Sequence, residues 1–352
     1  MRPSVTASPA RPHFTASSPS ERLPGESRLV DLIREWLGAA SPPSPRGMGD
    51  DCAVLPPGTP GEFRLATTDC VLRGRHFDDA VAPRHVGRKL VNRNLSDIAA
   101  MGGTPADALL SLVCGPDVAL PWLSEFFKGV AEACLAAGLE LSGGDCAEGG
   151  PGFFCATLAL TGFARRPLLR AGARAGDTLL VTGRLGGSLS SGRHHSFAPR
   201  LAEGRWLAGR DAVRAAMDVS DGLAKDLQAL LPKDCDALLF PEKIPISGEI
   251  AGAGPECVPE NAPPRPGSPL FRALCDGEDY ELLLAADTAR LPRLLSDWRR
   301  EFPGVPLSPI GLIVPAAPLA PCGRRLLLAA PGASPPVPFQ PSGYQHFSGE
   351  GA

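Results

Sequence analysis

Short apolar runs typical of strands alternate along the chain with segments of helical spacing, and this alternation constrains the fold more than any other feature. Strands are predicted over 52–55, 63–72, 108–114, 153–163, 178–182, 213–219, 236–240, 280–285 and 308–313. Helices are predicted over 27–37, 83–101, 121–137, 200–208, 220–231 and 288–301. Such an alternation predicts an α/β or α+β fold with two lobes. Residues 247–270, rich in Pro, Gly and Ala, are expected to form a long irregular connection.

The length of 352 residues exceeds the size at which one hydrophobic core keeps growing, so two domains are expected. The boundary is predicted near Arg165-Arg166-Pro167, which gives domains over 26–165 and 166–347. Residues 1–25, rich in Ser, Pro, Ala and Arg, are expected to form a disordered extension. An organelle transit peptide is the alternative, and the prolines of this segment disfavour the amphipathic helix that it would need.

Composition and charge exclude several classes of protein. The net charge is −3 and no run of five or six like charges is present, so neither a nucleic-acid groove nor binding to an anionic membrane is expected. No stretch of 18 consecutive apolar residues is present, so no membrane span is predicted. The ten cysteines include no CxxC pair, which favours reduced thiols in a cytoplasmic protein over a disulfide framework or a zinc site.

Acidic residues punctuated by glycine recur where predicted strands and helices end. The clearest stretches are Gly49-Asp50-Asp51, Ser142-Gly143-Gly144-Asp145 and 218–222, and Thr67-Thr68-Asp69 and Asp97 resemble them. Several carboxylates in one cleft repel each other unless cations lie between them. Mg²⁺ prefers oxygen ligands and commonly bridges carboxylates to the phosphates of a substrate. The pattern therefore predicts a magnesium and phosphate site.

Each of these signals has a plainer interpretation. Ser220 or Asp221 could simply cap the helix that follows, although a cap does not account for Asp218. The turn at 183–187 could wrap a phosphate with backbone amides or merely connect a strand to a helix. No lysine-bearing GxxxxGK[ST] loop is present.

The six histidines show no metal-ligand spacing. His194 and His195 are expected in a surface turn, whereas His76 is held as a possible substrate contact. No arrangement for nucleophilic covalent catalysis can be argued from the spacing of the sequence.

Seven motifs closely resemble the thiamine-monophosphate kinase family. They are GMGDDCAVL (47–55), TTDCVLRGRHF (67–77), NLSDIAAMGGTP (94–105), SGGD (142–145), AMDVSDGL (216–223), GEDYEL (277–282) and SGYQHF (342–347). This family shares a superfamily with aminoimidazole ribonucleotide synthetase and selenophosphate synthetase. The resemblance implies two lobes, an N-terminal ATP- and Mg-binding lobe whose strands form a barrel in a homodimer, and a C-terminal lobe. It also implies transfer of the γ-phosphoryl group of ATP to thiamine monophosphate.

The resemblance further implies roles for individual residues. The implied Mg²⁺ ligands are Asp51, Thr67, Thr68, Asp69, Asp97, Asp145, Asp218 and Asp221, with Asp218, Asp221 and Asp51 as the catalytic group. The implied ATP contacts are Gly144, Asp145, Arg170 and Ser220. The implied contacts to thiamine monophosphate are His76, Glu278 and Tyr344, the last as an aromatic surface for a thiamine ring.

Three positions depart from the pattern of the family. Glu148 stands where the family usually has a cation, Asp276 replaces a glycine, and Gly187 replaces an aspartate. Two further hypotheses therefore stay open at this point. The chain could be a synthetase of the same superfamily that acts on another small substrate, or a nucleotide-binding homologue without activity.

Overall fold

The computed structural model describes residues 28, 30–32, 35, 43–46, 49–250, 262–316, 325–329 and 335–340. The predicted extension 1–25 and Tyr344 lie outside this part. The chain divides into two compact units, 1–41 with 345–352, and 42–344, and all that follows concerns the second unit. The predicted domain boundary near residue 165 stays a prediction.

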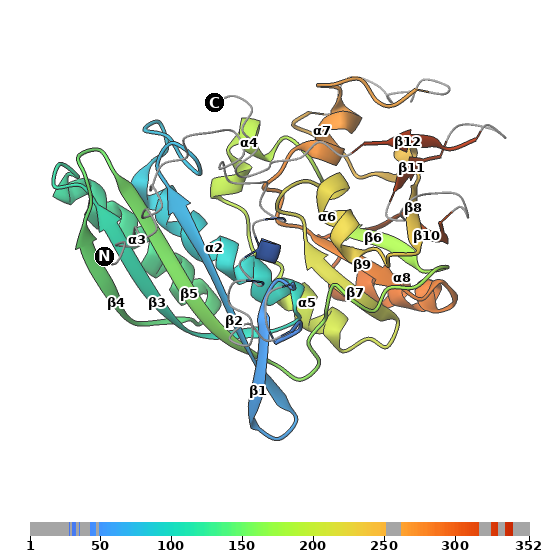
Figure 1. Cartoon of the computed structure of the whole chain (residues 1–352), viewed down its shortest axis with the longest axis horizontal. Coiled ribbons are helices and arrows are strands. Elements are labelled where there is room, and N and C mark those ends of the chain that lie inside the picture. Colours follow the sequence, from blue (N-terminus) through green and yellow to red (C-terminus); the bar gives the residue numbers. More distant parts are fainter. Residues whose placement is uncertain are drawn as a thin grey trace, which may run out of the picture. The chain divides into compact units, whose positions relative to one another are not determined.

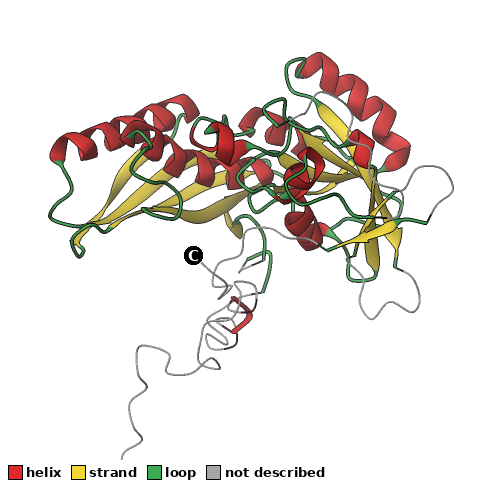
Figure 2. Cartoon of the chain, turned by 90° about the horizontal axis from the view of Figure 1, so that it is seen from above, coloured by secondary structure: helices red, strands yellow, loops and turns green. Residues whose placement is uncertain are grey.

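The first sheet has five strands in the order β1-β2-β5-β3-β4 (Figure 1). Its strands are β1 (Ala53–Thr59), β2 (Glu62–Leu72), β3 (Thr104–Cys114), β4 (Glu140–Glu148) and β5 (Phe154–Ala164). Helices α2 (Pro83–Ala100) and α3 (Leu120–Ala137) lie together over one face of this sheet (Figure 2). β3 and β4 are parallel because α3 connects them, and the other pairs are antiparallel.

Alternation of side chains along the strands explains why helices cover only one face. In β5, Leu158 and Leu160 are buried, whereas Ala159 between them and Thr161 and Phe163 after them are exposed. Leu109 of β3 is 54% exposed on the same side as Phe163, between the buried Ala108 and Leu110. We call this side the uncovered face of the first sheet.

Helix α2 carries several side chains of the site and is packed closely against α3. Pro83 begins the helix, where a missing N–H costs nothing. A Cβ on Gly87 would lie 2.0 Å from the carbonyl oxygen of Phe126, and one on Gly129 would lie 2.0 Å from that of Arg84. The two helices therefore approach each other through glycine backbone.

The second sheet has seven strands in the order β12-β11-β8-β10-β6-β9-β7. They are β6 (Thr178–Thr182), β7 (Val213–Asp218), β8 (Cys235–Leu239), β9 (Leu282–Ala286), β10 (Leu307–Pro315), β11 (Leu326–Leu328) and β12 (Val337–Phe339). The α-helices of this half are α4 (Ser188–Ser191), α5 (Leu201–Ala208), α6 (Leu223–Leu230), α7 (Pro269–Cys275) and α8 (Leu291–Glu301). Short 3-10 turns lie at Arg193–His195, Pro241–Lys243 and Thr288–Arg290.

The predicted fold class is confirmed, and most predicted elements lie within a few residues of their observed bounds. Among the described strands and α-helices, β4, α4, α7, β11 and β12 were not predicted. The SGGD stretch lies in strand β4 and not in a turn, and α7 begins at Pro269, where the irregular connection was expected to continue. Among the helices that the structure describes, none combines the length and apolar character that crossing a membrane requires.

Candidate active site

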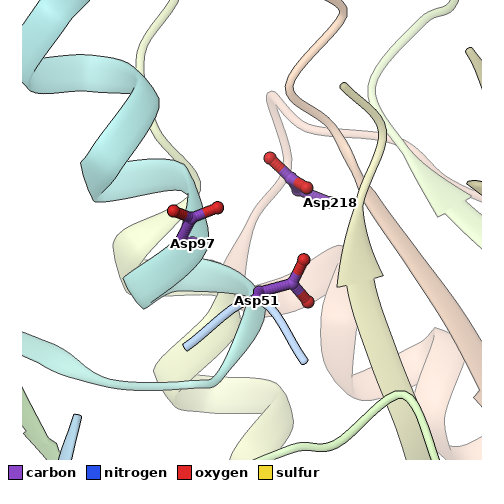
Figure 3. Close-up of side chains that lie close together, drawn as sticks. All are labelled: Asp51, Asp97 and Asp218. Atoms are coloured by element: carbon purple, nitrogen blue, oxygen red, sulfur yellow. The ribbon is translucent and has the colours of Figure 1, made fainter. Parts of the chain in front are cut away.

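Three carboxylates from distant parts of the sequence converge between the two sheets. Asp51 lies just before β1, Asp97 lies in the last turn of α2, and Asp218 ends β7. One oxygen of each lies within 4.8 Å of the others. Figure 3 shows the three side chains pointing toward a common space. We call these residues the aspartate trio.

Each member of the trio has one fixed neighbour. The hydroxyl of Thr67 donates to Asp97 at 2.5 Å, and that of Ser96 donates to Asp218 at 2.7 Å. The guanidinium of Arg170 donates to Oδ1 of Asp51 at 2.6 Å. These bonds fix the direction in which each carboxylate points.

The electrostatics of the trio are those of a cation site. Burial, with the charges of neighbouring carboxylates, raises the pKa of Asp97 above its ordinary value and that of Asp218 to about 7. Oδ2 of Asp51 is buried and has no hydrogen-bond partner among the described residues. A buried carboxylate oxygen without a partner is costly unless a ligand satisfies it. The trio therefore fits a hard divalent cation such as Mg²⁺.

The predicted ligands on β2 divide between the two faces of its sheet. Thr67 and Asp69 point toward α2, and Oδ1 of Asp69 lies 3.2 Å from the guanidinium of Arg93. Thr68 points to the other face and donates to the carbonyl oxygen of Leu158 at 3.0 Å. Thr67 and Asp69 thus lie beside the trio, whereas the Thr68 hydroxyl does not.

The loop after Asp218 is held by a residue that the sequence did not single out. The carboxylate of Asp226 accepts the backbone N–H groups of Ser220 and Asp221, at 2.9 and 3.0 Å. Asp221 pairs with Lys225 at 2.5 Å and is not part of the trio. The interpretation of Ser220 or Asp221 as a helix cap is wrong, because Gly222 precedes the helix and makes no side-chain cap.

Gly144 and Asp145 are not brought to the trio within one chain. Both lie in β4, an edge strand whose nine residues are all exposed. Two strands, β5 and β3, separate β4 from β2. Asp145 pairs in register with Ser111, on the uncovered face.

A second polar cluster surrounds Glu278, and His194 and His195 belong to it. The prediction of a surface turn for these histidines was wrong, because their side chains are buried and their rings lie 3.5 Å apart. Nδ1 of His194 lies 2.5 Å from Oε2 of Glu278, and the ammonium of Lys89 bonds to the same oxygen. The carbonyl oxygen of His76 accepts from Lys89 at 2.8 Å. Two of the predicted substrate contacts therefore share one cluster, which no spacing in the sequence reveals.

The turn at 183–187 binds carboxylates of its own chain. Gly186 donates its N–H to Asp279 at 2.8 Å, and Gly187 donates to Asp276 at 3.1 Å. These amides therefore have partners without a phosphate. Gly187 and Asp276 are two of the three departures from the family pattern, and this hydrogen bond brings them together. Nothing in the structure explains Glu148.

Known proteins with similar sequences and structures point to one family. Residues 49–164 match the family model described as AIR synthase related protein, N-terminal domain. Thiamine-monophosphate kinase of Rhodopirellula baltica is 36% identical over 278 residues, which cover 76% of this chain and 83% of the relative. That of Escherichia coli (strain K12) is 34% identical over 289 residues, covering 75% and 83%.

A solved structure supports the same relationship. AaThiL complexed with AMPPCP and TMP superposes with a TM-score of 0.71 at 26% identity, covering 95% of this chain and all of that one. A crystal structure of thiamine monophosphate kinase from Aquifex aeolicus gives a TM-score of 0.66 at 26% identity, covering 88% and 98%. These two structures share the fold over most of the chain.

Proposed function

Since the chain belongs to the thiamine-monophosphate kinase family, whose curated members are phosphotransferases, we propose that it phosphorylates thiamine monophosphate with ATP. A phosphate oxygen of thiamine monophosphate attacks the γ-phosphorus of ATP in line with the bond to the β,γ-bridging oxygen. That bond breaks, and the products are thiamine diphosphate and ADP. The support from relatives is that the solved neighbour carries AMPPCP and TMP together.

The observation that carries the proposal is the aspartate trio with its partnerless oxygen. Asp51, Asp97 and Asp218 would hold Mg²⁺, with Thr67 and Asp69 beside them. When bound, Mg²⁺ would neutralise charge on the phosphates of the nucleotide and on the group in transfer.

The side chains around the trio suit a reaction that needs little acid–base chemistry. The second pKa of a phosphate monoester is about 6, so the attacking oxygen is already ionised at pH 7 and needs no strong base. Around the trio, the hydrogen-bonding side chains are Thr67, Ser96 and Arg170, and none of them is a base. Catalysis then consists of orientation and charge neutralisation, which Arg170 supports by fixing Asp51.

A second subunit would complete the site. We propose a homodimer in which the uncovered faces meet, because the first sheet exposes Leu109 and Phe163 there. When two such sheets close into a twofold barrel, the β4 edge of one borders the β1–β2 edge of the other. Asp145 of the partner subunit would then approach Thr67 and Asp69, and Gly144 of the partner subunit would approach ATP. We place the reaction in the cytoplasm, since the described cysteines are free thiols.

The direct test is formation of thiamine diphosphate from thiamine monophosphate and Mg·ATP. We expect turnover by the wild type and a loss of at least about 100-fold in kcat for Asp218→Asn, because one carboxylate ligand is removed. Asp177→Asn is the matched control, since Asp177 is also buried and lies away from the trio, directly before β6. Unchanged turnover in Asp218→Asn would contradict the role of the trio, and ATP binding without product would favour a homologue without this activity.

A further inference from the structure

Lys89 is a fully buried lysine on α2 whose charge is directed at the other half of the molecule. Its residue exposure is 0%, and lysine is almost never so buried unless it is paired. The ammonium bonds to Oε2 of Glu278, lies 2.7 Å from Nδ1 of His194 and donates to the carbonyl oxygen of His76. Since Nδ1 of His194 donates to the same Oε2, the groups that accept from the ammonium are Glu278 and the carbonyl oxygen of His76.

The backbone of Glu278 is held as firmly as its side chain. Its φ is +62°, a left-handed conformation that a non-glycine residue keeps only where the surroundings impose it. Here Glu278 donates its N–H to Ser220 at 2.6 Å, and its carbonyl oxygen accepts from Ser188 at 2.7 Å. Tyr280, two residues on, donates to Val219 at 2.8 Å.

The two oxygens of Glu278 are not equivalent. Oε2 takes both the ammonium of Lys89 and Nδ1 of His194. Within the described part of the chain no hydrogen bond reaches Oε1, and the side chain retains 17% exposure. One oxygen is thus fixed by the protein, and the other is left as an acceptor.

The charge state of the cluster determines what Oε1 can bind. Burial lowers the pKa of Lys89 to about 8, and the nearby charge of Glu278 keeps it from falling further. Burial alone would raise the pKa of Glu278, but the bond from His194 and the charge of Lys89 bring it to about 2. At pH 7 the ion pair is therefore intact and the carboxylate charge is compensated. Oε1 is a hydrogen-bond acceptor rather than a counterion for a cationic ligand.

We propose that Lys89 and His194 are positioning residues for recognition of the phosphate acceptor. They hold Oε2 of Glu278 so that Oε1 can accept an N–H from an amine on the ring of the acceptor. This inference rests on the proposed function. Thiamine monophosphate carries one group of this kind, the amine of its aminopyrimidine. Lys89 and His194 touch no reacting atom and act only through the direction of the carboxylate.

The test measures KM for thiamine monophosphate and KM for Mg·ATP in Lys89→Met, in His194→Leu and in the wild type. Loss of a hydrogen bond to a charged group predicts a rise in KM for thiamine monophosphate of about 10- to 100-fold, with KM for Mg·ATP changed less than about twofold. His194→Asn should stay close to wild type, because its amide can donate from the position of Nδ1. A purely structural role would move both KM values and would not be rescued by asparagine.

Two controls make the result specific. Arg325→Met also removes a cation from a buried carboxylate, Asp236, far along the second sheet, and should leave both KM values unchanged. Oxythiamine monophosphate has a carbonyl oxygen in place of the amine. Wild type should discriminate against it, and Lys89→Met and His194→Leu should discriminate much less.

The outcomes separate this inference from the proposed function. If wild type makes thiamine diphosphate and folded Lys89→Met and His194→Leu have its KM for thiamine monophosphate, the positioning role is overturned and the function stands. If wild type neither binds nor phosphorylates thiamine monophosphate, the function fails and the inference with it. Calorimetry of thiamine monophosphate alone, with no ATP present, checks the ring contact without turnover.

Discussion

At the scale of single residues, the site depends on a few side chains whose neighbours determine their charge. Lys89 is charged below pH 8 and loses its proton above it, whereas Glu278, with its pKa of about 2, stays anionic throughout. His194 and Arg93 also face the ammonium, and His195 stacks on His194. Burial lowers the pKa of His195 to about 4, so it adds no charge near neutral pH.

A pH dependence of substrate binding follows from this cluster. We expect KM for thiamine monophosphate to rise above pH 8, by up to about tenfold per pH unit, until it reaches the value of Lys89→Met. The phosphate of the substrate, with a second pKa of about 6, is already ionised there and does not contribute. Initial rates between pH 7 and 9.5 measure the effect.

A loss of protein stability at Lys89 does not explain this expected rise in KM above pH 8. The lysine binds its proton with a pKa of 10.5 when unfolded and about 8 when folded, so between these values the unfolded state holds more protons. The contribution of Lys89 to the free energy of unfolding therefore increases as pH rises through this window. A KM that is flat to pH 9.5 in wild type would contradict the role of the charge.

At the scale of secondary-structure elements, the position of α2 matters most, because it carries Lys89, Ser96 and Asp97. Gly87 and Gly129 set its distance from α3, each facing a carbonyl oxygen of the other helix. Leucine side chains elsewhere in this half can shift to accommodate a small change in volume. The backbone-to-backbone contact of α2 with α3 cannot.

Gly129→Ala should therefore destabilise the chain. The added Cβ would force α2 and α3 apart, and overpacking of this kind costs about 1–3 kcal/mol. Denaturant unfolding measures the free energy. Gly150→Ala is the control, because its Cβ would meet nothing within 4 Å and its φ is not positive. Equal stability of the two variants would show that the helices can separate freely.

The elements also show what the sequence could and could not reveal. The spacing of Val86, Leu90 and Ile98 predicted α2, and the convergence of Asp51, Asp97 and Asp218 followed from their places at element ends. β4 could not be predicted, because Ser-Gly-Gly-Asp lacks the branched residues of a strand and becomes one only by pairing with β3.

The sequence also could not predict contacts between distant segments. His194 lies 105 positions from Lys89, and no periodicity connects them, so the histidines were expected at the surface. Gly187 and Asp276 lie 89 positions apart, and only the fold shows that they are hydrogen-bonded to each other.

At the scale of the whole molecule, the proposed dimer places each site across two chains. If Asp145 of the partner subunit completes the trio, Asp145→Asn and Asp218→Asn should each be inactive alone. In a mixed dimer, one site carries both substitutions and the other carries neither. Unfolding and refolding the two variants together should then restore roughly a quarter of wild-type activity, because about half of the dimers are mixed and each has one intact site.

Two further measurements test whether the dimer forms and which residues each subunit supplies. Leu109→Glu places a charge on the uncovered face and should yield a folded monomer, seen by light scattering, with little activity. Mixing Asp218→Asn with Asp51→Asn should restore nothing, since both residues belong to the same chain's trio. A site shared between subunits would be contradicted if activity returned in this mixture. It would also be contradicted if no activity returned when Asp145→Asn and Asp218→Asn are mixed.

The backbone pairing of 278–281 with 219–220 fixes the distance between Glu278 and Asp218. Glu278 and Tyr280 donate to Ser220 and Val219, and Val219 donates back to Glu281, directly beside Asp218. Main-chain atoms thus set the separation between Glu278, proposed to bind the ring of the acceptor, and Asp218, proposed to hold the Mg²⁺ that neutralises the phosphates. An acceptor with the same two ends but one more methylene between them could satisfy only one end at a time. Selectivity for the span of the acceptor would then come from this main-chain pairing, as long as both ends of the acceptor keep their contacts.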